Sequence, residues 1–132
     1  MKISMSFDFV LRVLSHIGNE QTFSKTTDLS KSLKIPYNHL IKIIHKLSKE
    51  NIIYTKRGKD GGVIMPNSSK NIPLNKLYQL FEPNHCIHKC IQNPSSCSLY
   101  NGCEIVPIYS DMQNSINQIL NKRKVKDIIR KK

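Results

Sequence analysis

The amino-acid sequence predicts a mainly α-helical chain with one small β-hairpin. Apolar residues recur at steps of three and four along most of the 132 residues, which is the spacing of one face of a helix. One stretch, residues 52–65, instead combines β-branched residues with glycines, as hairpins do. Three predicted helices precede this hairpin. The order therefore indicates a winged helix-turn-helix, followed by a fourth helix and a long C-terminal helix.

The first three helices follow from their apolar positions and their ends. Residues 5–18 form an apolar stripe that stops at Gly18, and residues 26–33 form a shorter one. A third helix is expected from Pro36 to about residue 49, because proline suits the first turn of a helix. Its predicted buried stripe consists of Leu40, Ile43, Ile44 and Leu47.

The hairpin and the fourth helix come next along the chain. Residues 52–55 and 63–65 are the predicted strands, and the glycine-rich run 57–62 is the turn between them. Residues 66–71 are polar and are expected to be a connector. The fourth helix is predicted over residues 74–81, since Pro83 stops it.

The C-terminal half contains a loop, a long helix and a basic end. Residues 84–103 are rich in Cys, Asn, Ser, Pro and Gly and show no period, so a loop is expected. An amphipathic pattern resumes at Val106 and runs to about Asn121, with a short helix around residues 125–129. Seven basic residues lie between positions 122 and 132, and this run is expected to be a solvated tail.

The charge of the chain favours a polyanionic partner. Lysine and arginine number 21 against 9 acidic residues, a net charge of +12. The chain also has no alanine, 17 lysines against 4 arginines, and 18 isoleucines. This bias is typical of AT-rich coding sequence and accounts for part of the lysine excess. The positions of the basic residues therefore carry more information than their number.

The compartment in which the chain is expected decides how its cysteines are interpreted. No apolar run approaches the roughly 20 residues of a membrane span, and Asp8 and Arg12 interrupt the first hydrophobic stretch. A cytoplasmic protein with no membrane association is therefore expected, where thiols stay reduced. All four cysteines fall within 18 residues. Clustered cysteines in such a protein are more often metal-binding or redox-active than disulfide-bonded.

The predicted fold supplies candidate residues for binding double-stranded DNA. In a helix-turn-helix the second helix of the pair enters the major groove, where Asn38 suits adenine and Lys42 suits guanine or phosphate. The start of the preceding helix suits phosphate, and Arg57 at the hairpin tip suits the minor groove. The candidate DNA-binding residues are Ser24, Lys25, Thr26, Pro36, Tyr37, Asn38, His39, Lys42, Arg57, Gly58 and Lys59.

The cysteines are spaced as ligands of an iron–sulfur cluster. Cys90, Cys97 and Cys103 are separated by six and five residues, and three thiolates at one locus suit iron–sulfide chemistry. No Cys-x-x-Cys occurs, so zinc-ribbon and thioredoxin-like patterns are absent. Two alternatives remain open. One is thiols that are inert or form switching disulfides, and the other is a zinc site formed by His85, Cys86, His88 and Cys90.

Several motifs resemble those of the nitric-oxide-sensing repressors of the Rrf family of bacterial winged-helix regulators. The motifs are Met1-Lys2-Ile3-Ser4, Phe7-Asp8-Phe9, Leu11-Arg12, Asn38-His39-Leu40-Ile41-Lys42-Ile43-Ile44, Arg57-Gly58-Lys59-Asp60-Gly61-Gly62 and the trailing cysteines. The resemblance covers residues 1–129. It implies a homodimer joined by the helix 106–121, an operator DNA with Arg57 at its minor groove, and nitric oxide as the signal. It also implies that Cys90, Cys97 and Cys103 hold an iron–sulfur cluster, with Asp8 of the partner subunit as fourth ligand.

The sequence departs from this family pattern at three places. Cys86 is an additional thiol and is an alternative to Asp8 as the fourth ligand. Phe7 stands where a small hydroxyl residue is usual. The C-terminal end is basic rather than acidic.

The resulting hypothesis divides the chain into a DNA-binding domain (1–83), a cluster-binding loop (84–104) and a dimerisation helix with a basic tail (105–132). It describes a transcriptional repressor that senses nitric oxide or redox state through an iron–sulfur cluster, of the 4Fe–4S rather than the 2Fe–2S type. The alternative is a cluster-free repressor of the same fold that senses oxidants or electrophiles through its thiols. An electron-transfer or cluster-carrier protein is a third reading. An enzyme is not expected, because no nucleophile–base pair or phosphate-binding loop is present.

Overall fold

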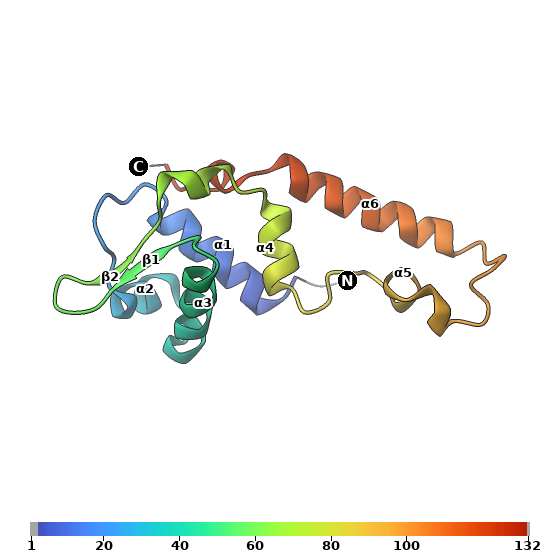
Figure 1. Ribbon diagram of the computed structural model, residues 1–132, viewed down its shortest axis with the longest axis horizontal. Coiled ribbons are helices and arrows are strands. Elements are labelled where there is room, and N and C mark those ends of the chain that lie inside the picture. Colours follow the sequence, from blue (N-terminus) through green and yellow to red (C-terminus); the bar gives the residue numbers. More distant parts are fainter. Residues whose placement is uncertain (1–2, 132) are drawn as a thin grey trace.

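The structure, a computed structural model, describes residues 3–131, so Met1, Lys2 and Lys132 of the motifs and basic run lie outside the described residues (Figure 1). The helices are α1 (Met5–Ile17), α2 (Thr26–Leu33), α3 (Tyr37–Lys49), α4 (Leu74–Phe81), α5 (Lys89–Gln92) and α6 (Val106–Lys122). The strands are β1 (Tyr54–Lys56) and β2 (Gly62–Ile64), and short 3₁₀ helices cover Asn67–Asn71, Pro94–Ser96 and Val125–Asp127. The predicted fold class, helical with a hairpin wing, is confirmed.

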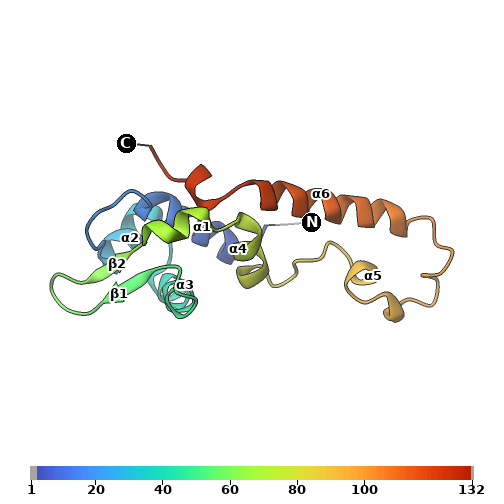
Figure 2. The same ribbon diagram turned by 45° about the horizontal axis from the view of Figure 1, so that its top comes forward.

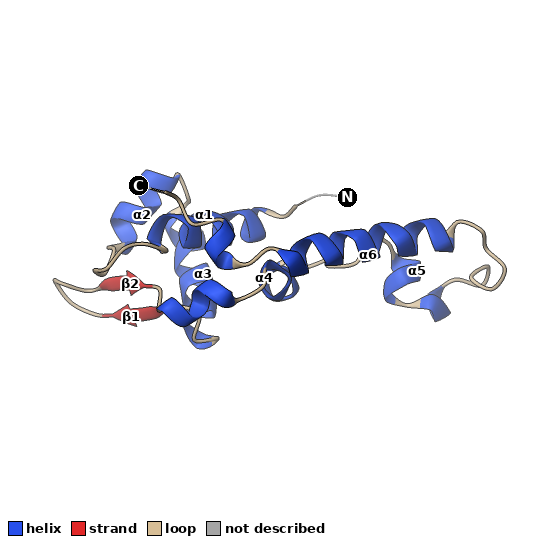
Figure 3. Cartoon of the chain, turned by 90° about the horizontal axis from the view of Figure 1, so that it is seen from above, coloured by secondary structure: helices blue, strands red, loops and turns tan. Residues whose placement is uncertain are grey.

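The molecule is elongated, with the hairpin at one end and the cysteine-containing residues at the other (Figures 1 and 2). Helices α1–α3 and the hairpin pack together, and α4 connects them to the far end. Viewed from above, α6 runs along the molecule and α5 folds back beneath it (Figure 3). The two features that the sequence singled out therefore lie at opposite ends of the chain's long axis.

The ends of the first three helices have simple physical causes. Helix α1 begins at Ser4, whose Oγ accepts a hydrogen bond from the Phe7 N–H at 3.1 Å. Helix α2 ends at Lys34, which takes a left-handed conformation (φ 55°) and donates its N–H to the Ser30 carbonyl. Helix α3 starts after Pro36, and its predicted stripe of Leu40, Ile43, Ile44 and Leu47 is buried.

The hairpin begins later than the sequence suggested. Strand β1 pairs antiparallel with β2, with Tyr54 opposite Ile64. Ile52 and Ile53 were predicted to lie in the first strand, but they precede it and are completely buried. The Ile52 N–H donates to the Leu47 carbonyl at 2.9 Å, so these two residues end the α3 turn and fill the core. Two consecutive buried residues do not fit a strand whose side chains alternate between core and solvent.

One loop prediction was wrong in part, and the predicted connector contains a short helix. Residues 84–103 were expected to be an irregular loop, but they contain α5 and the 3₁₀ helix Pro94–Ser96. The connector at 66–71 is itself largely a 3₁₀ helix. These elements are only one turn long, which is too short for an apolar period to show in the sequence.

The basic C-terminal end is not a solvated tail over residues 123–131. Val125 is completely buried, and its N–H donates to the Ile72 carbonyl at 2.9 Å. Further along, the Arg130 N–H donates to the Ser15 carbonyl of α1 at 2.9 Å. The segment therefore folds back onto the DNA-binding half and holds the end of α6 against it. The charged side chains point outward while the apolar ones between them pack.

Candidate DNA-binding surface and cysteine segment

A groove of about 710 Å³ lies between α3 and the hairpin. Its lysine and arginine side chains come from the start of α2 and from the hairpin, and α3 contributes Tyr37, His45 and Ser48. Positive charge with hydroxyl groups suits a phosphate backbone. Six of the predicted DNA-binding residues line it: Lys25, Thr26, Tyr37, Arg57, Gly58 and Lys59. The structure thus brings the start of α2, the start of α3 and the wing tip to one surface.

The remaining predicted residues on α3 divide into two groups. Pro36, Asn38 and Lys42 are exposed beside the groove. His39 is only half-exposed: its Nε2 lies 3.0 Å from the Ser6 Oγ, and its ring packs edge-on against Phe9 at 4.9 Å. His39 therefore joins α3 to the first turn of α1, and its ring is engaged away from the groove.

Ser24 fixes the hairpin to the rest of the domain. Its N–H donates to the Val63 carbonyl at 2.8 Å and its carbonyl accepts from the Val63 N–H at 2.9 Å. Ser24 was predicted to contact phosphate, and the structure gives its backbone this additional structural role. Two backbone hydrogen bonds therefore join the wing to the residue just ahead of α2.

The groove also contains residues that the sequence did not predict to bind DNA, and Ile41 is one of them. Ile41 lines the groove and is 40% exposed, although isoleucine is a core residue elsewhere in α3. The signal was present, because position 41 falls outside the buried stripe of that helix.

The four cysteines are free thiols in different surroundings. Cys90 is buried, Cys97 is exposed, and Cys86 and Cys103 lie between these extremes. The Cys90 Sγ is 3.3 Å from the Nδ1 of His88, and the His88 ring packs against Tyr109 of α6 at 5.0 Å. We call residues 84–104 the cysteine segment.

A buried glutamine attaches the cysteine segment to α6. Gln113 is 6% exposed. Its Oε1 accepts from the Ile87 N–H at 2.8 Å, and its Nε2 donates to the His85 carbonyl at 3.1 Å. The same Nε2 lies 3.1 Å from the Asn117 Oδ1. A single side chain thus satisfies two peptide groups of the segment just ahead of Cys90.

The thiols do not converge in this conformation. Within residues 3–131, no three His, Cys, Asp or Glu side chains are grouped so that they could hold a metal ion. This applies to Cys90, Cys97 and Cys103 and equally to the zinc alternative with His85 and His88. In the described chain, the hydrogen bonds of residues 93–104 join residues that are at most four positions apart in the sequence. No long-range bond among them fixes where Cys97 and Cys103 lie.

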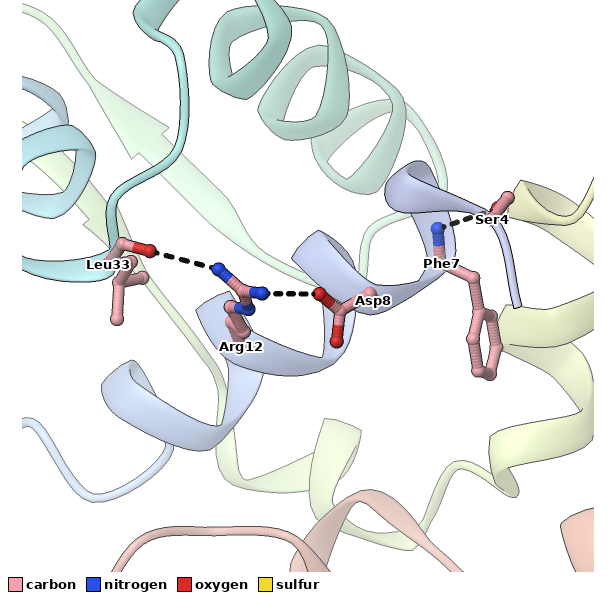
Figure 4. Close-up of polar contacts among 5 residues, drawn as sticks. All are labelled: Ser4, Phe7, Asp8, Arg12 and Leu33. Carbon is pink, nitrogen blue, oxygen red and sulfur yellow. Dashed lines mark hydrogen bonds and ion pairs between the residues drawn. The ribbon is translucent and has the colours of Figure 1, made fainter. Parts of the chain in front are cut away.

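Asp8 lies on α1 and forms an ion pair with Arg12, at 2.7 Å (Figure 4). The Arg12 Nη1 also donates to the Leu33 carbonyl at the end of α2, at 3.3 Å. The side chain of Asp8 is 42% exposed, so its carboxylate is accessible to a second molecule. An exposed ion pair of this kind contributes little to stability.

Two side chains connect the end of α4, just before the cysteine segment, to the start of α1 and to α3. The buried Glu82 carboxylate accepts the Ser4 N–H at 2.9 Å. Lys46 of α3 donates to the Leu80 carbonyl, and its ammonium lies 5.1 Å from the Phe81 ring centre. Burial raises the pKa of the nearby Tyr78 hydroxyl, and the charges of Glu82 and Cys86 raise it further.

Comparisons with known proteins match this architecture over its full length. Residues 3–131 match the family described as "Rrf2: Iron-dependent Transcriptional regulator". The chain belongs to the Rrf2 family. The HTH-type transcriptional regulator NsrR of Shouchella clausii is 24% identical, covering 98% of this chain and 89% of that protein. As members are transcriptional regulators, the prediction that the chain is not an enzyme is confirmed.

Two solved structures share the fold. CymR, the global cysteine regulator of B. subtilis, superposes with a TM-score of 0.75 at 11% identity, over 97% of this chain and 95% of CymR. IscR of T. potens gives a TM-score of 0.69 at 15% identity, over 97% and 85% of the two chains. At these identities the likeness shows the fold alone. No helix among residues 3–131 is long and apolar enough to cross a membrane.

The residues of this Rrf2 protein fit an iron–sulfur cluster by chemistry. Four free thiols within one short segment are the ligand type that iron–sulfide chemistry requires. Their positions in the described conformation do not form the site, as stated above. The hydrogen bonds of residues 93–104 in the described chain join only near neighbours. This part of the segment can therefore change conformation without loss of contacts in the hydrophobic core.

Proposed function

We propose that the protein is a homodimeric transcriptional repressor that binds operator DNA through α2, α3 and the wing. In this proposal Cys90, Cys97 and Cys103 hold an iron–sulfur cluster of the 4Fe–4S type, with Asp8 of the partner subunit or Cys86 as the fourth ligand. The observation that carries the proposal is the pairing of two sites in one chain. A basic groove suited to DNA lies at one end, and a thiol-rich segment attached to α6 lies at the other.

Its DNA-binding part rests on the arrangement of the groove. Lys25, Thr26 and Arg57 line the same groove from the start of α2 and from the wing, which places positive charge beside α3. Such contacts release counterions from DNA. The logarithm of the association constant therefore falls linearly with the logarithm of the salt concentration, with a slope of about 0.9 for each phosphate neutralised.

Arg57→Ala should weaken DNA binding about tenfold, since an arginine contact in a groove is worth roughly 1–3 kcal/mol. The measurement is a mobility shift over a series of salt concentrations, with duplexes selected by the protein from random DNA. Arg123→Ala is the matched control, because it removes the same charge from an exposed residue that does not line the groove. Equal weakening by both variants would remove the wing from the proposal.

The homodimer is supported by the exposed apolar side chains at and along α6. They recur at helical steps and have no cover in the described chain: Ile105, Ile108, Met112 and Ile119. An exposed apolar stripe of this kind marks an interaction surface, and a second copy of the same helix matches it. A dimer would also allow the accessible Asp8 of one subunit to approach the thiols of the other. The free protein should therefore sediment as a dimer.

In the cluster proposal the protein supplies thiolates and a connection to α6. A bound cluster would supply iron that reacts with nitric oxide. Gln113, His88 and Tyr109 hold the Cys90 part of the segment against α6. Glu82 and Lys46 join the preceding helix to α1 and α3. A change in the segment can thus reach the DNA-binding half through packed and hydrogen-bonded residues.

The cluster proposal is tested by anaerobic purification followed by visible absorption spectroscopy and iron and sulfide assay. We expect a coloured protein whose iron content falls in Cys97→Ser and Cys103→Ser variants and remains in Cys86→Ser if Asp8 is the fourth ligand. Nitric oxide should bleach the colour and lower operator affinity together. An iron-free protein that binds its operator and releases it normally in response to nitric oxide would contradict the cluster proposal.

The contact between His88 and Cys90 favours the second candidate, a thiol-based sensor. The imidazole Nδ1 at 3.3 Å from the Cys90 sulfur is a partner that can exchange a proton with the thiol. In this candidate, peroxide would reversibly abolish DNA binding by iron-free protein, and Cys90→Ser would not respond. The two candidates therefore differ in whether iron is needed for the response.

A further inference from the structure

The apolar residues exposed on the DNA-binding half are concentrated beside the groove. Tyr37 (48% exposed), Ile41 (40%) and Tyr54 (52%) lie on α3 and β1, and Tyr37 and Ile41 line the groove itself. Apart from Ile3 and Met5 near the start of α1, the other large exposed apolar residues of the described chain lie on α6 or ahead of it. Ile41 lies outside the buried stripe of Leu40, Ile43, Ile44 and Leu47, so it has no role in the core.

Ile41 is surrounded by residues that suit DNA. On an α-helix its neighbours are the residues three and four positions away, which include the exposed Asn38 and His45. Lys42 follows it directly, and Lys25 and Arg57 line the same groove. A helix that brings Asn38 and Lys42 to the major groove also brings Ile41 close to it. At 3.6 residues per turn, position 41 lies about 60° around the helix from position 38 and about 100° from position 42.

The major groove contains one apolar group for such a side chain. Thymine carries a C5-methyl group there, and cytosine carries only hydrogen at the same position. Positive charge around an isoleucine favours DNA over a purely apolar partner, because DNA combines anionic phosphates with exposed methyl groups. This match of charge and shape identifies the occupant of the exposed Ile41 surface.

We propose that Ile41 reads thymine methyl groups, so that the operator has A·T base pairs beneath the middle of α3. The inference rests on the proposed DNA-binding function and adds the base type that this surface selects. Asn38, one turn earlier, suits the adenine edge of a neighbouring pair. Together the two residues make recognition of A·T pairs the specific part of binding, while Lys25 and Arg57 supply the sequence-independent part.

The test uses duplexes that the protein selects from random-sequence DNA. Each thymine of the selected site is replaced in turn by deoxyuridine, which removes the methyl group and keeps the hydrogen-bonding edge. We expect affinity to fall about fourfold at one or two positions in each half-site, as for one buried methylene of about 0.8 kcal/mol. Ile41→Ala should bind the thymine and uracil forms of those positions equally.

Two control variants keep the outcomes separate. Ile41→Val retains a branched side chain and should keep part of the thymine preference, and thermal denaturation shows whether each variant is folded. Lys42→Ala should bind more weakly overall while keeping the full thymine-to-uracil ratio. A ratio unchanged between the native protein and Ile41→Ala would overturn the inference and leave DNA binding intact. If no sequence were enriched and no salt-sensitive binding occurred, the proposed function itself would fail.

Discussion

Gly62→Ala should be strongly destabilising, by about 3–5 kcal/mol, and should abolish tight DNA binding. Gly62 has φ of +142°, which side-chain-bearing residues rarely adopt. A Cβ there would lie 2.1 Å from the Ser24 carbonyl oxygen and 2.6 Å from its carbon. Relief requires the Ser24–Val63 pair of hydrogen bonds to break, at about 1 kcal/mol each, in addition to backbone strain of about 1–3 kcal/mol. Urea denaturation and mobility shift measure the two effects.

Gly58→Ala is the matched control for this experiment. Gly58 lies at the tip of the same hairpin with φ of +105°, but a Cβ there meets nothing within 4 Å. The substitution therefore adds backbone strain without a collision and should cost about 1 kcal/mol. If both alanine variants unfolded at the same urea concentration, the close approach of the wing to Ser24 would not be what holds the hairpin.

The regular helices could be predicted because the spacing of apolar residues in each helix marks its buried face. The stripe of Leu40, Ile43 and Ile44 marks the buried face of α3, and the turn after α2 follows from the short gap before Pro36. The hairpin was placed correctly but started too early, because Ile52 and Ile53 have the composition of a strand and the burial of a core. Composition cannot distinguish a strand from a buried core segment, because both favour β-branched residues.

The C-terminal segment and the site depend on contacts between distant residues, and these left weaker signals. The apolar spacing around Val125 and Ile129 predicted a short helix, but the basic residues around it gave no sign that these two residues pack on Ile72 and α1. The cysteine spacing predicted the type of ligand and not the conformation of the segment. His39 was read as a residue facing DNA, and its contact with Ser6 depends on where α1 crosses α3. Nothing in the sequence singles out Gln113, because α6 contains several Asn and Gln residues. Only the contact with the cysteine segment makes this glutamine the buried one.

Gln113→Leu should release the cysteine segment from α6. Leucine fills a similar volume but offers no partner to the Ile87 N–H and the His85 carbonyl, which Gln113 now satisfies. A buried peptide group left without a partner costs about 1–3 kcal/mol, so the docked conformation should become a minor one. We expect the Ile87 amide to exchange its hydrogen at least tenfold faster and the buried Cys90 thiol to react faster with iodoacetamide.

Gln118→Leu is the control for this last variant, because it makes the same substitution at an exposed position of α6. It should leave both the exchange rate and the alkylation rate unchanged. Gln113→Glu retains an acceptor for the Ile87 N–H and loses the donor to His85, so its effect should be intermediate. Slow exchange and slow alkylation in Gln113→Leu would mean that His88 and Tyr109 hold the segment without the glutamine. A released segment that still controlled DNA binding would show that the signal does not pass through α6.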